Sequence, residues 1–246
     1  MTTTPSTPAP KLDNLGVTLN SFPSSVDYTV GMPSDLGVML NDRLGDCTCA
    51  AFFHAIQVWT FNCGNMVTYS DNDVKLLYEK ADGYVDGDSS TDQGGNENHV
   101  LDYLLSQGAT TSDGKVQKIA AFVQLNEQNH DHIKSAVYDC GVVYLGFSVP
   151  SYILPPDGDA PPVWDINPSW DKQYEGGHAV IIAGYDDNGV KVISWGKYYT
   201  MTWNFWDAFV DQAFAMTSPD WINAKGVNPL GLSLDQLDSL MQTFKN

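Results

Sequence analysis

Residues 41–52 read NDRLGDCTCAAF, and this stretch decides which fold the sequence predicts. The Gly-Asp pair in it predicts a tight turn, followed over residues 47–61 by a run that is apolar on nearly every side of a helix. A helix with that pattern is buried all round. The turn therefore places Cys47 in the first helical turn, where free backbone N–H groups and the helix dipole favour an anion. We expect the pKa of this thiol to be depressed, and a thiolate is a suitable nucleophile for acyl transfer.

A candidate base for this thiol lies in the other half of the chain. His178 opens the apolar run HAVIIAGY, residues 178–185, which predicts a strand. Turn residues DDNG at 186–189 and a second apolar run over 190–196 complete a predicted hairpin. We expect His178 to act as the base across a cleft, and the alternative of a hydrogen-bonded strand histidine stays open.

Helices are predicted mainly in the first half of the chain and antiparallel strands in the second. The spacing predicts helices over 70–82, 97–107, 129–139 and 232–245, a strand over 142–149, and a strand or a helix over 203–215. Ser70 and Ser233 are the expected caps of the first and last of these helices, and Gly108 is the expected stop of the second. The predicted fold class is α+β, with two lobes and a cleft between them.

The composition suits one folded domain. The chain has 246 residues, 43% of them hydrophobic, and begins with a Thr/Pro-rich tail over residues 1–18 that we expect to be extended. A single domain is predicted over 19–246, with a helical lobe over about 40–140 and a β lobe over about 141–215. The formal charge of −18 argues against nucleic acid and anionic membranes as partners. It leaves open a merely hydrated surface or a preference for cationic substrates.

The absence of targeting signals and the number of cysteines bear on localisation and redox state. The sequence has no signal peptide and no apolar stretch long enough for a membrane span, so we expect a cytoplasmic or virion-associated protein. Four cysteines do not form a disulfide scaffold in a chain of this length, and a Cys63–Cys140 bond stays open. Nothing in the sequence indicates the oligomeric state.

Three sequence blocks resemble the papain-like cysteine peptidases. They are Cys47 followed by AAF, His178 followed by AV and later AGY, and SWG at residues 194–196. The spelling LGDC at 44–47 looks most like the calpain branch. The resemblance implies a papain-like two-lobed fold and hydrolysis of a peptide or protein substrate by Cys47 and His178. It implies no metal and no organic cofactor, and we expect a bacterial or phage branch.

The resemblance also implies further site residues. Asn41 stands six residues before Cys47, where the family has the glutamine that stabilises the oxyanion. Gly94 and Gly95 match the glycine pair that lines the family's substrate groove, and Trp195 matches the tryptophan that shields the histidine. The asparagine that orients the histidine falls on Ile193, which cannot form that hydrogen bond. Ser194 is the nearest polar side chain, but neighbouring strand residues point to opposite faces, so a β-bulge would be needed to bring it round.

Other candidate residues have structural explanations. Cys49 and His54 lie within the buried helix and are expected in the core. Neither the His130–His132 segment nor the pair Asp157 and Asp159 has the spacing of a metal site, so we expect solvated side chains. Two other functions stay open. The missing asparagine favours a catalytically weak or inactive protein that binds peptide or glycan, and the order of Cys and His also suits a cell-wall peptide amidase.

Overall fold

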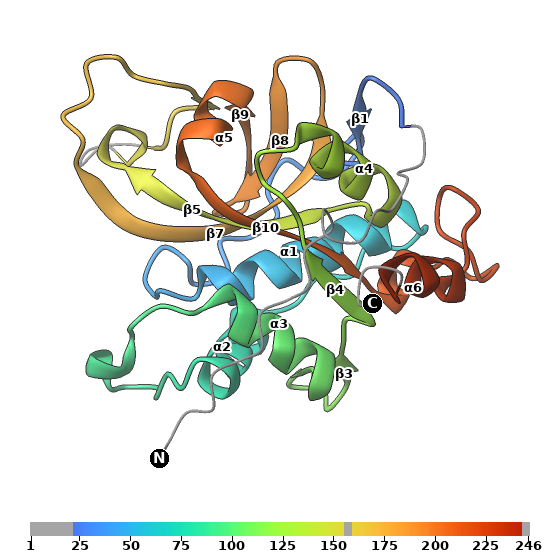
Figure 1. Cartoon of the computed structure of the whole chain (residues 1–246). Helices are drawn as coiled ribbons and strands as arrows, with labels where there is room; N and C mark the ends of the chain where they lie inside the picture. Colours follow the sequence, from blue (N-terminus) through green and yellow to red (C-terminus); the bar gives the residue numbers. More distant parts are fainter. Residues whose placement is uncertain (1–21, 155–158, 243–246) are drawn as a thin grey trace.

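The structure is a computed structural model that describes residues 22–154 and 159–242 (Figure 1). The predicted tail over 1–18, the end of the predicted C-terminal helix and Asp157 lie outside these residues. The helices are α1 (Cys47–Asn62), α2 (Asp71–Ala81), α3 (Glu97–Ser106), α4 (His130–Cys140), α5 (Trp203–Phe209) and α6 (Leu234–Gln242). The strands are β1 (Val26–Asp27), β2 (Ala109–Thr110), β3 (Val116–Gln117), β4 (Ala121–Gln124), β5 (Val143–Pro150), β6 (Val163–Trp164), β7 (Tyr174–Tyr185), β8 (Gly189–Ser194), β9 (Lys197–Thr202) and β10 (Val210–Thr217).

One large sheet organises the molecule. Its strand order is β4-β10-β5-β7-β8-β9-β6, and β1 adds to β7. The pairs are antiparallel except for β6 with β9. The long central strands β5 and β7 pair from Val143 opposite Ile182 to Phe147 opposite His178 and beyond, so His178 stands in the middle of the sheet. The α+β class predicted from the sequence is confirmed.

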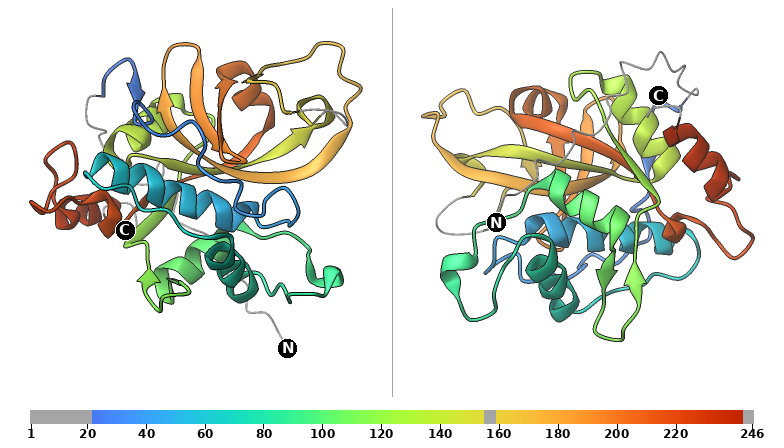
Figure 2. Two further views of the ribbon diagram at one scale, coloured as in Figure 1. Left: turned by 180° about the vertical axis from the view of Figure 1, so that it is seen from behind. Right: turned by 60° about the horizontal axis from the view of Figure 1, so that its bottom comes forward.

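Helices cover both faces of this sheet. Helices α1, α2 and α3 lie on one face, and α4 and α5 lie on the other, as the views in Figures 1 and 2 agree. A core cluster on the α1 side contains Trp59, Ile181 and Ile193, and a second cluster on the other side contains Val180 and Trp206. The alternation of β7 residues between the two clusters therefore identifies which face each side chain occupies.

Helix α1 runs through the core. Every residue from Thr48 to Thr60 is buried, which confirms the prediction from its apolar pattern. Fully burying side chains such as Phe52, Phe53 and Ile56 contributes about 1.5–3 kcal/mol each. The first turn of α1 is thus anchored by the rest of the helix, and Cys47 is held in a fixed place.

Most of the predicted elements are present, with one ambiguous segment resolved. Ser70 caps α2 in a reciprocal capping box with Asp73, and Ser233 Oγ accepts the Gln236 N–H at 3.3 Å before α6. The aromatic run over 203–215, predicted as strand or helix, contains both, because α5 leads directly into β10. Thr202 caps α5 by accepting the N–H of Phe205, which fixes where the helix begins.

The cysteines and the helix lengths bear on two further expectations. All four cysteines are free thiols, so the Cys63–Cys140 bond that the sequence left open is not formed. Among the helices of the described residues, none combines the length and the apolar character that crossing a membrane requires.

Candidate active site

Residues from both halves of the chain line a cleft of about 370 Å³. It lies where the first turn of α1 and the start of α3 face the strands β5, β7 and β10. Its lining comprises Gly45, Cys47, Thr48, Gln93, Gly94, Gly95, Glu97, Gly146, Phe147, Gly177, His178, Ala179, Asp211 and Gln212. Cys47 and His178 thus share one cleft, although 131 residues separate them in the sequence.

The sulfur of Cys47 lies directly against the backbone of β7. The Ala179 N–H donates to Sγ at 3.4 Å, which places the thiol beside the peptide that follows His178. The turn before the helix is fixed as well, because the Gly45 N–H donates to Asp92 Oδ1 at 2.9 Å. Within the described residues no hydrogen bond joins the sulfur to the imidazole, although Cys47 and His178 line the same cleft.

The ring of His178 is held on three sides. Its Nε2 and the Ser194 Oγ are 2.7 Å apart, at hydrogen-bond distance. The Trp195 ring stacks on the imidazole with centroids 4.6 Å apart and 10° between the planes, and Phe147 presents its ring at 5.8 Å. Since Nε2 is engaged by Ser194, Nδ1 is the ring nitrogen that is left to exchange a proton in the cleft.

A β-bulge brings Ser194 to the face of His178. Counting from the hairpin turn, Gly184 pairs with Lys191, but Ile182 pairs with Val192, so β7 has one extra residue at this point. In an uninterrupted ladder Ser194 would lie on the α1 face, and Ile193 would share the face of His178. With the bulge Ile193 enters the core under α1. The bulge that the sequence argument required is present, and Ile193 does not occupy the place beside the histidine.

Burial sets the protonation of both groups. It raises the pKa of the Cys47 thiol to about 11, and the charges of Glu97 and Asp46 add to the effect against the Ala179 hydrogen bond. Burial also lowers the pKa of His178 to about 3. The expectation of a depressed thiol pKa is therefore wrong for this structure, because desolvation and two nearby carboxyls outweigh the backbone hydrogen bonds that lower the pKa. Both shifts favour a thiol and a neutral imidazole over a thiolate–imidazolium pair.

Asn41 is not directed into the cleft. Its Nδ2 donates to Asp46 Oδ1 at 3.2 Å and to Leu44 O at 3.4 Å, and Asn41 is absent from the residues that line the cleft. Both N–H donors of this amide are engaged in the turn, and its role as an oxyanion donor stays a prediction. Asp46 itself is fully buried, and its Oδ2 lacks a hydrogen-bond partner among the residues that the structure describes.

The two predicted groove glycines line the cleft, and the packing explains why each is glycine. Gly94 has a φ of +76°, a conformation that side chains disfavour. A Cβ on Gly95 would meet Thr48 Oγ1 and lie 2.5 Å from Asp82 Oδ2. Trp195, in contrast, covers His178 and does not line the cleft.

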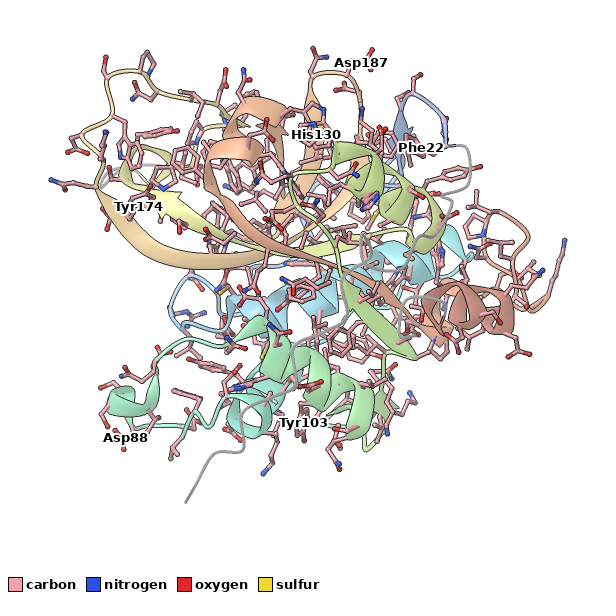
Figure 3. The ribbon with its side chains drawn as sticks, viewed as in Figure 1. Phe22, Asp88, Tyr103, His130, Tyr174 and Asp187 are labelled. Atoms are coloured by element: carbon pink, nitrogen blue, oxygen red, sulfur yellow. The ribbon has the colours of Figure 1, made fainter. Side chains whose placement is uncertain are left out.

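The remaining candidates from the sequence lie outside this cleft. Cys49 is buried with Sγ 3.8 Å from Asp82, and His54 Nδ1 lies 2.8 Å from Gln57. His130 is on the opposite face of the sheet (Figure 3), where Nε2 pairs with Asp207 at 2.6 Å. Asp159 pairs with Lys197 at 2.9 Å. Among the described residues no group of three His, Cys, Asp or Glu side chains is arranged to hold a metal ion.

Three residues that form an acidic, hydrogen-bonded part of the cleft lining were not predicted from the sequence. Glu97 and Asp211 are acidic, and Gln212 joins them by donating from Nε2 to Glu97 Oε2 at 2.8 Å. Glu97 is the first residue of α3, after the cap Asn96, so its pattern only indicates a helix start. The position of Glu97, two residues after the predicted groove residue Gly95, was a signal that it lies near the cleft. The sequence alone does not show its contact with β10.

Comparison with solved structures agrees with this architecture. No family model and no curated protein matches the sequence. Xylellain, a cysteine protease from Xylella fastidiosa, superposes with a TM-score of 0.63 at 18% identity over 85% of this chain and 90% of its own. Procathepsin B from Trypanosoma congolense gives 0.59 at 16% identity, over 87% and 83%. Digestive procathepsin L 3 from Tenebrio molitor gives 0.58 at 15% identity, over 80% and 71%. The chain therefore has the fold of the papain-like cysteine proteases.

Proposed function

We propose that the protein is a cysteine peptidase, in which Cys47 is the nucleophile and His178 the general base. The observation that carries the proposal is that Cys47 Sγ lies 3.4 Å from the Ala179 backbone nitrogen, in the cleft that His178 also lines, while Ser194 and Trp195 hold the imidazole. Nucleophilic thiol catalysis needs a thiol and a base in one cleft, with the base oriented by a third group. The fold shared with cysteine proteases supports a peptide or protein as the substrate.

In this mechanism the proton moves as the substrate is attacked. The Cys47 sulfur adds to the amide carbonyl carbon while His178 Nδ1 takes the thiol proton. The Cys47 backbone N–H, one of the free donors at the start of α1, stabilises the developing oxyanion. His178 then returns its proton to the leaving amine as the C–N bond breaks. Water, deprotonated by His178, hydrolyses the resulting thioester and restores the thiol.

The test combines turnover with active-site labelling. Fluorogenic peptides and casein are offered to the wild-type protein, Cys47→Ala and His178→Ala, and mass spectrometry locates an epoxide or iodoacetamide adduct. We expect turnover and an adduct on Cys47, both lost in Cys47→Ala, with Cys49→Ala as the matched control that retains them. Labelling that is confined to Cys49 or Cys63, with no turnover, contradicts the proposal.

A non-catalytic binding function is the second candidate. It is favoured by the engaged amide of Asn41 and by the burial that raises the pKa of Cys47. In that case peptide or glycan binds in the cleft and is recovered intact. Incubation with peptidoglycan also tests the third possibility, cleavage of cell-wall peptides, by release of free amino groups.

A further inference from the structure

Two carboxylates form an acidic wall of the candidate active-site cleft. Glu97 and Asp211 line it, and no Lys or Arg of the described residues does. Neither carboxylate has an ion-pair partner within the described residues. The charged lining of the cleft is therefore entirely negative.

Contacts from two strands of the sheet hold the Glu97 carboxylate in place. Oε2 accepts from Gln212 Nε2 at 2.8 Å, so the carboxylate of a helical-lobe residue is tied to strand β10. Oε1 lies against the Cα of Gly146 on β5, where a side chain would collide with it. The glycine at 146 thus leaves space that the Glu97 carboxylate fills.

Asp211 offers a second acceptor from the opposite lobe. Its Oδ2 accepts from Ser148 Oγ at 2.8 Å, and its side chain is exposed. Without a cationic partner, the half-buried carboxylate of Glu97 costs more free energy than the exposed carboxylate of Asp211. A carboxylate withdrawn from water needs a compensating charge or hydrogen bonds. Gly177, also in the lining, leaves room for a long side chain to reach this wall.

We propose that Glu97, assisted by Asp211, selects peptide substrates that place a lysine or arginine side chain in this cleft. The inference rests on the proposed peptidase function and adds the class of side chain recognised. Both cationic head groups can donate to two carboxylates at once, and charge-assisted hydrogen bonds are stronger than neutral ones. The choice between lysine and arginine is an outcome of the test.

The test uses peptides that differ only in charge. Arginine is compared with citrulline, its neutral isostere, and lysine with norleucine, at each of three positions before and two after the scissile bond. We expect kcat/KM at one position to favour the cationic residue by about 10- to 100-fold at low salt. Glu97→Gln should reduce this preference, measured as the ratio of the two kcat/KM values within the variant, to within about threefold. Asp211→Asn should reduce it less.

The control separates a local contact from the field of the whole protein. Glu175→Gln removes one negative charge from an exposed residue of β7 that does not line the cleft. It should keep the cationic preference. Equal turnover of the charged and neutral peptides, or equal loss of preference in Glu97→Gln and Glu175→Gln, overturns the inference.

A binding measurement distinguishes failure of this inference from failure of the proposed function. Fluorescence anisotropy with Cys47→Ala reports affinity for the same peptides without catalysis. Selective binding of the arginine peptide, lost in Cys47→Ala/Glu97→Gln, supports the inference even if the wild-type protein hydrolyses nothing. Absence of any cationic preference in binding and in turnover overturns it, and thermal melting of each variant verifies that it is folded.

Discussion

The hydroxyl of Ser194 lies 2.7 Å from Nε2 of His178, on the face that the β-bulge in β7 creates. This hydroxyl stands where the resemblance to papain-like peptidases led us to expect an asparagine. A hydroxyl can accept from Nε2–H or donate to a bare Nε2, so it supports either tautomer of the ring. Catalysis through Nδ1 requires the proton on Nε2, and the Trp195 stacking then fixes the plane in which Nδ1 points.

Removing this hydroxyl should impair the base without removing it. For Ser194→Ala we expect kcat/KM to fall by about 10- to 100-fold, because an unanchored ring samples the wrong tautomer and orientation. Ser194→Thr, which keeps the hydroxyl, should recover most of the activity. Steady-state kinetics with a fluorogenic peptide measure both, and Ser106→Ala on the exposed side of α3 is the control. An unchanged rate in Ser194→Ala shows that the hydrogen bond does not position the base.

Alkylation of Cys47 should follow the titration of a thiol whose pKa is raised. Burial and neighbouring carboxyls raise the pKa of Cys47 to about 11, so the thiolate fraction rises with pH across the whole accessible range. We expect the rate constant for iodoacetamide to increase about tenfold per pH unit from pH 6 to pH 9. Mass spectrometry of the Cys47 peptide separates this reaction from that of Cys63.

A different profile would identify a different resting state. A rate that is already constant below pH 7, and that loses this plateau in His178→Ala, shows a thiolate–imidazolium pair. Such a plateau contradicts the neutral pair that burial favours here. The Ala179 N–H would then be the donor that stabilises the thiolate sulfur.

The sequence allowed the elements that carry the site to be predicted because their patterns are local. The apolar run after Cys47 specifies a buried helix, and the DDNG turn specifies the hairpin that carries His178. The bulge could not be located in the same way. In VIIAGY every side chain is apolar on both faces of the sheet, so the alternation gives no sign of where one residue is inserted.

Contacts between residues far apart in the sequence could not be predicted either. The role of Glu97 in the cleft depends on Gln212, which is 115 residues away in the sequence. The engaged amide of Asn41 depends on the buried position of Asp46, whereas the prediction rested only on an offset of six residues from Cys47. The protonation of Cys47 depends on how closely the lobes pack, which a helix N-terminus alone does not reveal.

Asn41→Ala distinguishes a support of the turn from an oxyanion donor. Since its Nδ2 donates to Asp46 and Leu44, we expect kcat to fall by less than about tenfold. The free energy of unfolding should fall by about 1–3 kcal/mol, because buried Asp46 loses its donor. Asp42→Ala, at an exposed neighbouring position, should change neither. A loss of about 10²–10³ in kcat with normal stability shows instead that the amide turns into the cleft during catalysis.

The carboxyl of Asp46 should make stability depend on pH. Burial raises its pKa from 3.8 to about 7, and Asp92 and Asp71 add to the shift against the hydrogen bond from Asn41. Between these two pH values the folded protein binds more protons at this site than the unfolded chain does. Its contribution to stability is therefore complete below about pH 4 and declines as the pH rises toward 7.

Asp46→Asn removes this titration and keeps an acceptor for the Asn41 amide. Urea unfolding at pH 4, 5.5 and 7.5 should show the wild-type protein losing a few kcal/mol relative to the variant, at about 1.4 kcal/mol per pKa unit. Other buried carboxyls titrate in both proteins and cancel in the difference, and Asp42→Asn should parallel the wild type. If the curves of wild type and Asp46→Asn remain parallel, Asp46 ionises at its ordinary pKa. Its unpartnered Oδ2 must then be hydrated, and the thiol of Cys47 has a charged neighbour throughout the physiological range.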